Sequence, residues 1–386
     1  KFGDVPYTTK VLSIKESMSI ARTAKATVIA NVLADLDEVI NGNYLPTSYD
    51  ADNKGRITRW AAMAIKAKIY LFEGNWTQVK NITSTIMTEG GFKLFGSYAG
   101  LFEIANEYNS EVILDAQYRP TSREHQMMYV FLPPTLGGYS QLSPLQELVD
   151  SYIMLDGKTI KETGTSFDES HPYANRDPRL KATVMYTGNS YTLADGTEVV
   201  INCEKGEGKD GYGVGSDCSA TGYYIKKYWD NTYRATLYSG LNPILIRYAD
   251  ILLMNAEALA ELGELDKTAW DATIKPIRDR AGFTLASALE FPEGASKDKL
   301  IEIVRNERRS ELALEGHRHK DIIRWRIADN VLNGWCHGLK TNDVVGTDDG
   351  YVRVENRTFN ANKHYLWPIP QAERDLNGNL EQNPNW

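Results

Sequence analysis

Carboxylates and arginines alternate along a helix that apolar periodicity predicts over Lys297 to Glu315. Glu307 and Glu311 lie four residues apart and share a helix face with the apolar Leu300 and Val304. Two carboxyl groups are what glycoside hydrolases use for acid and base catalysis. Several arginines belong to the same segment, however, and a nearby cation keeps a carboxyl group ionised. The pattern therefore favours a lattice of ion pairs, and we predict no catalytic residue.

Candidate metal sites are incomplete. The segment from Asp50 begins like a calcium loop, but Lys54 and Ala61 stand where oxygen ligands are needed. His317 and His319 are two residues apart, which places them on different faces of a helix, and no third ligand follows at zinc spacing. Phosphate-binding loops and serine-hydrolase elbows are not found either. We predict neither a metal ion nor a cofactor.

The chain has three cysteines: Cys203, Cys218 and Cys336. Cys203 and Cys218 flank a Gly-rich loop and can pair in an oxidising compartment. An odd count leaves one thiol over, and sequence spacing does not give the Cα separation that a disulfide needs. The redox state of this pair is therefore open.

Aromatic residues are abundant in polar, Gly-rich surroundings, with 22 Tyr and 8 Trp in the chain. Both types combine a flat apolar face with a polar edge, and stacking on a sugar ring is expected to contribute about 1 kcal/mol per exposed ring. In a strand, Tyr224 and Tyr228 face one side and Tyr223 the other, so some of these rings pack inside and others reach solvent. The candidate ligand-binding residues are Tyr139, Tyr212, Tyr223, Tyr228, Trp229, Tyr233 and Trp335.

Helices are expected on both sides of this aromatic region. Apolar periodicity predicts helices over residues 19–40, 58–72 and 76–88, and a later pair over residues 245–261 and 265–280. The segment WAAMAIKAKIYLFEGNW has the order of small, aromatic and Gly positions of a tetratricopeptide-like helix. We therefore predict a mainly α fold with two tetratricopeptide-like helix pairs, as in an α-solenoid.

Between the helix pairs the pattern changes. Residues 111–118 resemble a strand, and KATVMYT and TEVVIN are strand-like pieces between turn signals. So long an irregular insertion usually has a function, which makes it the candidate ligand face. Residues 333–362 are predicted to be a polar loop, followed by an irregular tail. The predicted segments are a helical scaffold (1–110), a loop-rich ligand face with short strands (111–240) and a second helical part with the tail (241–386), all in one compact unit.

Net charge and hydropathy exclude some classes of binding partner and a membrane-spanning helix. The net charge of −8 comes from 43 Lys and Arg against 51 Asp and Glu, without a long basic tract, so a nucleic-acid partner is not expected. No apolar run approaches the roughly 18 residues of a membrane-spanning helix. The sequence opens at Lys1 without Met or a signal segment, so a targeting sequence is expected either to have been removed or to lie outside the given sequence.

Several segments together resemble the SusD/RagB family and follow its order along nearly the whole chain. They are FGDVPYTTK, NKGRITRWAAMAIKAKIYLFEGNW, NEYNSEVILDAQY, LVDSYIMLDGK with NRDPRLKATV, RYADILLMNAEALAELG, ERRSELALEGHRHKDIIRW and YLWPIPQAERDLNGNLEQNPNW. The resemblance implies a tetratricopeptide-like scaffold with an irregular ligand face. It also implies that Asp177-Pro178-Arg179 and the ERR helix hold the fold, whereas ligand residues vary too much to be carried over.

The same resemblance implies a non-enzymatic lipoprotein of the outer membrane that faces the extracellular side. Its expected partner is a SusC-like TonB-dependent transporter, and its expected ligand is an oligosaccharide captured for import. The lipid anchor is expected on a segment that this sequence does not include. Two alternatives are open: capture of peptides, as in RagB-like members, and a helical-repeat scaffold that binds only protein.

Overall fold

The structure is a computed structural model, and it describes residues 1–232 and 236–386. The chain divides into two units. Unit 1 comprises residues 1–46, 319–334 and 357–386, and unit 2 comprises residues 47–318 and 335–356. Unit 2 takes in parts of all three segments predicted from the sequence, and the proposed boundaries at 110 and 240 stay a prediction.

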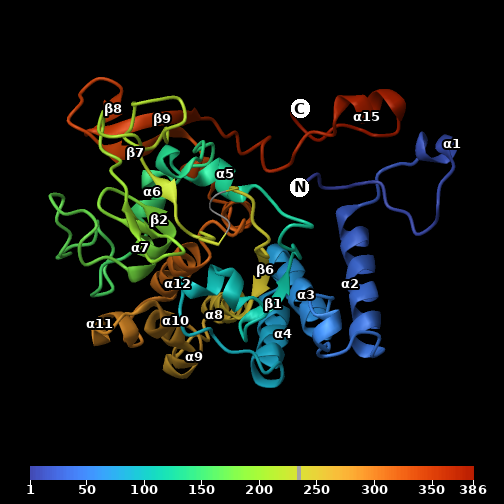
Figure 1. Cartoon of the computed structure of the whole chain (residues 1–386). Coiled ribbons are helices and arrows are strands. Elements are labelled where there is room, and N and C mark those ends of the chain that lie inside the picture. The colour runs from blue at the N-terminus through green and yellow to red at the C-terminus, as the bar shows by residue number, and fades with distance from the viewer. Residues whose placement is uncertain (233–235) are drawn as a thin grey trace. The chain divides into compact units, whose positions relative to one another are not determined.

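Helices form the framework of unit 2 (Figure 1). They are α3 (Arg59–Glu73), α4 (Trp76–Glu89), α8 (Tyr248–Leu262), α9 (Lys267–Ala272), α10 (Ile274–Ala281) and α12 (Lys297–Glu311). Gly74 ends α3 and Gly263 ends α8, both in the left-handed conformation with φ of 71° and 74°, and their amides bond carbonyls of the last turn. The first predicted helix pair is therefore confirmed as α3 and α4, and the first helix of the second pair as α8.

Helix α8 is central because residues 249–260 are all buried. It packs against α3, α4 and α12. Asp250 forms ion pairs with Lys68 of α3 (2.8 Å) and Arg308 of α12 (2.6 Å). The Asn255 amide donates to Thr83 Oγ1 of α4 at 2.9 Å. Two helix pairs far apart in the sequence thus share one interface.

The predicted helix over residues 265–280 is interrupted at Thr273, which separates α9 from α10 with φ −125° and ψ −70°. Pro276 lies in the first turn of α10, where its missing N–H leaves no helical hydrogen bond unmade. In one continuous helix, the ring of Pro276 would clash with the carbonyl of Ala272, and one helical hydrogen bond would be missing.

Four small antiparallel sheets complete unit 2. The pairs are β1 (Val112–Asp115) with β6 (Ile244–Arg247), β2 (Val184–Met185) with β5 (Tyr224–Ile225), and β3 (Ser190–Thr192) with β4 (Glu198–Val200). The fourth sheet has the order β7 (Gly334–Lys340), β9 (Tyr351–Arg357), β8 (Thr347–Asp348). Short helices connect them: α5 (Met127–Phe131), α6 (Gln146–Val149), α7 (Pro178–Thr183) and α11 (Ala286–Leu289). A mainly helical fold with a strand-containing insertion is confirmed.

Two strand predictions are wrong. Residues 333–362 are not a loop but contain the three-stranded sheet, because Cys336, Leu339 and Val352 are buried among polar neighbours. The aromatic segment 223–233 is not one strand, because β5 ends at Ile225 and Tyr228 has a φ of 64°. The expected alternation of Tyr223, Tyr224 and Tyr228 therefore does not occur.

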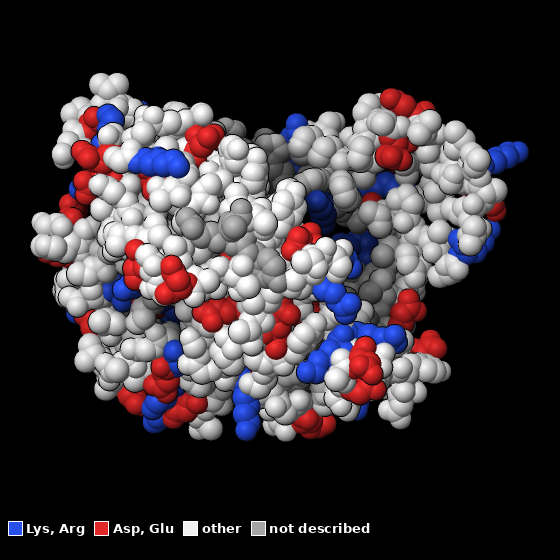
Figure 2. All heavy atoms as spheres, in the orientation of Figure 1, with Lys and Arg blue, Asp and Glu red and all other residues white. Residues whose placement is uncertain are grey.

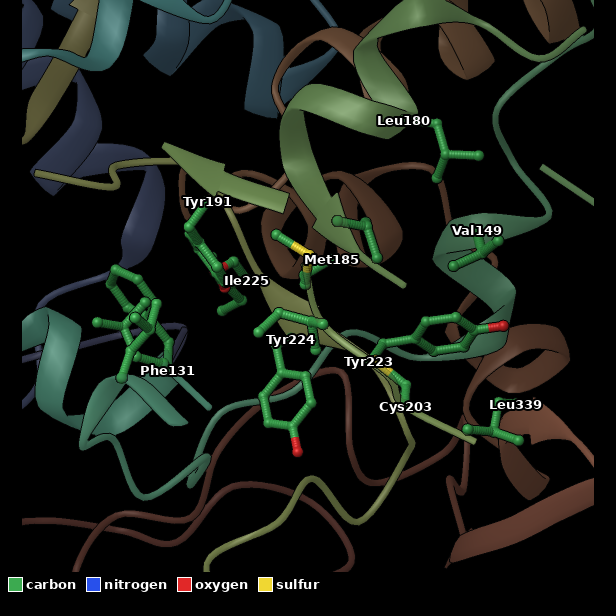
Figure 3. Close-up of a cluster of buried hydrophobic side chains, with 14 of the residues drawn as sticks. Phe131, Val149, Leu180, Met185, Tyr191, Cys203, Tyr223, Tyr224, Ile225 and Leu339 are labelled. Atoms are coloured by element: carbon green, nitrogen blue, oxygen red, sulfur yellow. The ribbon is translucent and has the colours of Figure 1, made fainter. Parts of the chain in front are cut away.

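The largest apolar core of unit 2 surrounds β2 and β5 (Figure 3). Tyr191, Tyr223 and Tyr224 are buried in it together with aliphatic side chains such as Leu180 and Met185. The Tyr191 hydroxyl donates to the carbonyl of Ile225 at 2.6 Å. Much of the aromatic content of the insertion therefore serves packing.

Unit 1 joins the two ends of the chain. Its helices are α1 (Ile14–Ser17), α2 (Lys25–Asn41), α13 (Arg318–Arg324), α14 (Ala328–Val331) and α15 (Gln371–Leu376). Helix α2 begins six residues later than the predicted start at Ser19. The Arg22 guanidinium donates to Glu381 O at 2.8 Å and Asn383 Oδ1 at 2.6 Å, so the C-terminal tail packs on the N-terminal segment. Among the residues described, no helix has the length and apolar character needed to cross a bilayer.

Candidate functional site

Two carboxylates of α12, those of Glu307 and Glu311, lie in a buried network that we call the ionic lattice. Its members are Glu111, Asp177, Arg179, Lys227, Arg247, Arg278, Arg280, Glu307, Glu311 and Glu315. Glu311 alone pairs with Arg179 (2.8 Å), Arg247 (2.6 Å) and Arg280. The predicted ion-pair role of Glu307 and Glu311 is confirmed, as is the structural role of Asp177-Pro178-Arg179.

Charge attraction outweighs burial for these carboxyl groups. Burial by itself would raise the pKa of Glu311, but Arg280, Arg247 and Arg179 together lower it well below the usual range. Burial likewise opposes ionisation of Glu315, yet Arg247 and Lys227 lower its pKa to about 2. A general acid needs a raised pKa, so this geometry suits a structural role.

A cavity of about 970 Å³ opens elsewhere in unit 2 and is the candidate functional site. Three chain segments surround it: residues 167–176, residues 203–207, and residues 339–343 at the end of β7. Tyr186, Tyr223 and Tyr351 complete its wall. Concave sites of this size with several aromatic side chains and some polar groups are typical of ligand binding.

A pair of stacked tyrosines dominates the wall. The rings of Tyr173 and Tyr186 lie 3.9 Å apart between centroids at an interplanar angle of 18°. The Tyr173 hydroxyl lies 3.3 Å from the Tyr223 hydroxyl, which in turn donates to Gln146 Oε1. Burial raises the pKa of Tyr173 to about 12, so it stays a neutral phenol that can donate and accept. The wall therefore offers an apolar ring surface edged by hydroxyl groups.

Arg176 fixes the segment that carries Tyr173. Its guanidinium donates to the carbonyls of Val149 (2.6 Å), Tyr152 (2.8 Å) and Pro172 (2.7 Å) and lies over the ring of Phe167 at 5.4 Å. The residue is 6% exposed. These bonds hold the loop on the core, because a buried guanidinium without acceptors would be costly.

Gly222 allows β7 to close another side of the cavity. Its φ of 74° is left-handed, and a Cβ there would lie 1.7 Å from a methyl carbon of Leu339. The Leu339 amide donates to the Thr221 carbonyl at 2.7 Å. Only glycine permits this close approach, which brings Lys340 and Thr341 to the rim.

Ion pairs connect the three segments at the rim. Lys340 pairs with Glu169 at 2.9 Å, and Lys205 pairs with Asp343. These side chains are between 36% and 69% exposed, unlike those of the lattice. On the face of the molecule that Figure 2 shows, acidic and basic side chains are likewise intermixed in small groups.

Cys203 and Cys218 are free thiols in the structure, so the disulfide considered between them does not form. Cys203 lines the cavity but is 2% exposed, and burial raises the pKa of its thiol. The Cys218 thiol instead lies 3.3 Å from the carbonyl of Lys209. Cys203 is therefore an unreactive packing residue, because the thiolate is the reactive form.

The predicted ligand residues lie in different environments in the structure. Tyr223 lines the cavity, although it is 2% exposed and reaches the wall mainly through its hydroxyl. Tyr228 is 7% exposed and packs on Phe102 with ring centroids 4.8 Å apart, so the expectation of an exposed ring is wrong for it. Tyr212 and Trp229 are partly buried against the core, where the Trp229 indole donates to Thr192 O at 2.8 Å. Tyr233 lies outside the described residues.

The two remaining candidates are exposed but do not line the cavity. Tyr139 is 40% exposed and packs on Tyr129 with centroids 4.4 Å apart. Trp335 is 43% exposed, and the Arg353 guanidinium lies over its ring at 5.7 Å. Both stay candidate contacts for a ligand that extends over the surface of unit 2.

Sequence analysis missed the residues that form the aromatic wall: Phe167, Tyr173, Tyr186 and Tyr351. Tyr173 follows His171-Pro172, and Tyr186 precedes the Gly188-Asn189 turn. An aromatic residue beside a turn signal is the one local feature that these two share. Their proximity depends on tertiary contacts between segments distant in the sequence.

Comparison with known proteins identifies the family. The family model described as SusD family matches residues 101–386. The SusD-like protein P25 of Formosa agariphila is 28% identical over 355 residues, which cover 86% of this chain and 61% of that protein. The chain thus spans about three fifths of the length of this curated relative.

Solved structures share the fold over nearly the whole chain. A SusD-like carbohydrate binding protein from Bacteroides fragilis superposes with a TM-score of 0.86 at 29% identity, covering 98% of this chain and 76% of that one. A second SusD-like protein from the same species gives a TM-score of 0.82 at 28% identity, covering 100% and 76%. The family match extends over well more than half of the chain and agrees with the resemblance seen in the sequence. The chain belongs to the SusD family.

Proposed function

We propose that this protein captures oligosaccharides at the bacterial cell surface and delivers them to a SusC-like TonB-dependent transporter of the outer membrane. Family membership and a similar protein described as carbohydrate binding support the ligand class. The transporter, the lipid anchor and the outward-facing location follow from the family resemblance. The observation that carries the proposal is the cavity with the stacked Tyr173–Tyr186 pair.

A saccharide matches the chemistry of this wall. Sugar rings present C–H groups on one face and hydroxyl groups at the edge, which suits tyrosines that combine an apolar face with a polar group. The volume of about 970 Å³ is near the upper end of the roughly 300–1,000 Å³ typical of small-ligand sites, which favours an oligomer over a single sugar. A few stacking contacts give modest affinity, which suits a protein that must pass its ligand on.

Binding without hydrolysis is the proposed activity. The paired carboxylates that a glycosidase would need are, in α12, committed to buried arginines that keep them ionised. The protein would therefore act through affinity and delivery. Release of reducing sugar from a bound oligosaccharide, abolished by Glu307→Gln or Glu311→Gln in a folded variant, would overturn this part.

Calorimetric titration with a panel of oligosaccharides tests the ligand and the site together. Tyr186→Ala removes one ring of the wall, and we expect the dissociation constant to rise about five-fold, which corresponds to about 1 kcal/mol per ring contact. Tyr139→Ala is the matched control, because it removes an exposed tyrosine that packs on another tyrosine outside the cavity.

The outcomes separate the alternatives. Weaker binding by Tyr139→Ala and unchanged binding by Tyr186→Ala would move the site to the Tyr129–Tyr139 pair. Peptide binding without any glycan binding would favour the RagB-like alternative. Recovery of a barrel transporter with the membrane-anchored protein, by co-purification and mass spectrometry, tests the partner, and its consistent absence would contradict delivery.

A further inference from the structure

We propose that the cavity selects neutral oligosaccharides and discriminates against those that carry uronate or sulfate groups. This inference rests on the proposed function, because it specifies the ligand class of the same site. It concerns the charged side chains of the cavity wall, and not its aromatic surface. Three observations carry it.

First, the cationic side chains of the wall already have partners within the protein. The cavity is lined by three Lys and Arg side chains: Arg176, Lys205 and Lys340. The two nitrogens at the end of the Arg176 guanidinium donate to backbone carbonyls within 2.8 Å, and its Nε donates to Tyr152 O at 3.2 Å. Lys340 is paired with Glu169 and Lys205 with Asp343. An anionic ligand could gain a cation here only by breaking one of these ion pairs.

Second, the wall has more carboxylates than cations. Glu169, Glu204, Glu207 and Asp343 line the cavity, which makes four carboxylates against three Lys and Arg side chains. His171 also lines it, and its imidazole lies 2.8 Å from Asp168. Glu204 and Glu207 are exposed, and within the part of the chain that the structure describes neither forms an ion pair. A carboxylate or sulfate on the ligand would therefore meet two uncompensated negative charges.

Third, the remaining polar groups suit hydroxyl groups of a ligand. The phenols of Tyr173 and Tyr186 have raised pKa values because of burial, so they are neutral donors and acceptors at physiological pH. Thr187 and Asn342 also line the cavity with uncharged polar side chains. Neutral hydroxyl groups can be matched by such partners without moving any charge.

Repulsion between an acidic group of a bound ligand and the carboxylates of Glu204 and Glu207 should be strong enough to measure. Like charges a few ångströms apart at a protein surface change affinity by about ten-fold or more, and salt reduces the effect. We therefore expect each neutral oligosaccharide to bind about ten-fold more tightly than its carboxylated counterpart at low ionic strength. The difference should narrow as salt is added.

The test uses matched probes. Maltohexaose, cellohexaose, xylohexaose and laminarihexaose are titrated by calorimetry beside versions of the C6-bearing sugars in which the C6 hydroxyl is oxidised to a carboxylate. The same titrations are made with the double variant Glu204→Gln/Glu207→Gln, for which we expect the neutral-to-acidic affinity ratio to fall toward one. Glu302→Gln is the control, because Glu302 is a 61% exposed carboxylate outside the cavity and should leave the ratio at its wild-type value.

The outcomes distinguish this inference from the proposed function. Equal or tighter binding of the oxidised sugars to the wild type would overturn the selectivity while leaving glycan capture intact. An unchanged neutral-to-acidic affinity ratio in the double variant would show that Glu204 and Glu207 do not cause the preference for neutral sugars. This result would also overturn the inference. Failure of every sugar to bind would instead remove the proposed function and this inference with it.

Discussion

The ionic lattice and the cavity rim use the same residue types in different surroundings. In the lattice, the side chains of Arg179, Arg247 and Glu311 are at most 1% exposed, and Glu311 meets three guanidinium groups. At the rim, Lys340 and Glu169 are 43% and 69% exposed and share a single contact of 2.9 Å. Burial is the main difference between the two regions.

Solvent decides what each arrangement can do. Charges removed from water must be paired completely, because an unpaired buried charge costs several kcal/mol. Exposed pairs are screened by water and salt, so they contribute little to stability. The lattice therefore holds the helices together, while the rim is free to discriminate among ligands. The following changes test this contrast.

The largest effect is expected from Glu311→Ala. This change leaves Arg179, Arg247 and Arg280 without their shared carboxylate in a buried site. We expect the free energy of unfolding to fall by roughly 3–5 kcal/mol. Chemical denaturation followed by circular dichroism measures it.

Glu302→Ala is the control on the same helix, since Glu302 is 61% exposed and forms an ion pair with Lys299 at 3.2 Å. Its expected cost is below about 0.5 kcal/mol. Equal stability of Glu311→Ala and Glu302→Ala would show that buried ion pairs of the lattice stabilise the protein no more than exposed ones do.

An intermediate effect is expected at His337, which links β7 to α6. Its Nδ1 lies 2.8 Å from Glu147 and its Nε2 lies 3.0 Å from Asp348, so both nitrogens can donate when the ring is protonated. Partial burial opposes protonation, but the bonds to Asp348 and Glu147 raise the pKa of His337. Its stabilisation is fully present below the ordinary histidine pKa of about 6.5 and is lost as pH rises through the raised value.

His337→Asn should therefore reduce stability more at pH about 5.5 than at pH about 8.5, by about 1 kcal/mol or less because the site is partly exposed. Denaturation at both pH values measures the difference. His171→Asn removes a 74% exposed histidine beside Asp168 and should show a smaller dependence. A larger loss at the higher pH for His337→Asn would contradict the assignment.

The smallest effect is expected from Lys340→Met at the rim. Because this pair with Glu169 is exposed, we expect the free energy of unfolding to change by less than about 0.5–1 kcal/mol and the change to shrink in high salt. Thermal unfolding at low and high salt measures it. A loss as large as that of Glu311→Ala would remove the distinction between the two regions.

Local patterns predicted the helical framework well, because helix periodicity and glycine caps act within a few residues. The helices that became α3, α4, α8 and α12 were identified, as was the ion-pair role of Glu307 and Glu311. The sheet at residues 334–357 was missed, since β7 and β9 are largely polar in sequence and show no regular alternation of buried and exposed positions, which leaves only a weak local signal.

The sequence by itself determined where helices form and that α12 needs its arginines, because both follow from the spacing of side chains on one helix. The tertiary structure decided which tyrosines face the cavity. Tyr223 and Tyr228 are five residues apart and chemically identical, yet one meets the wall of the cavity and the other packs against Phe102. Tyr173, Tyr186 and Tyr351 meet only because separate loops fold onto one core, and long-range packing of this kind leaves no trace in the spacing of neighbouring residues.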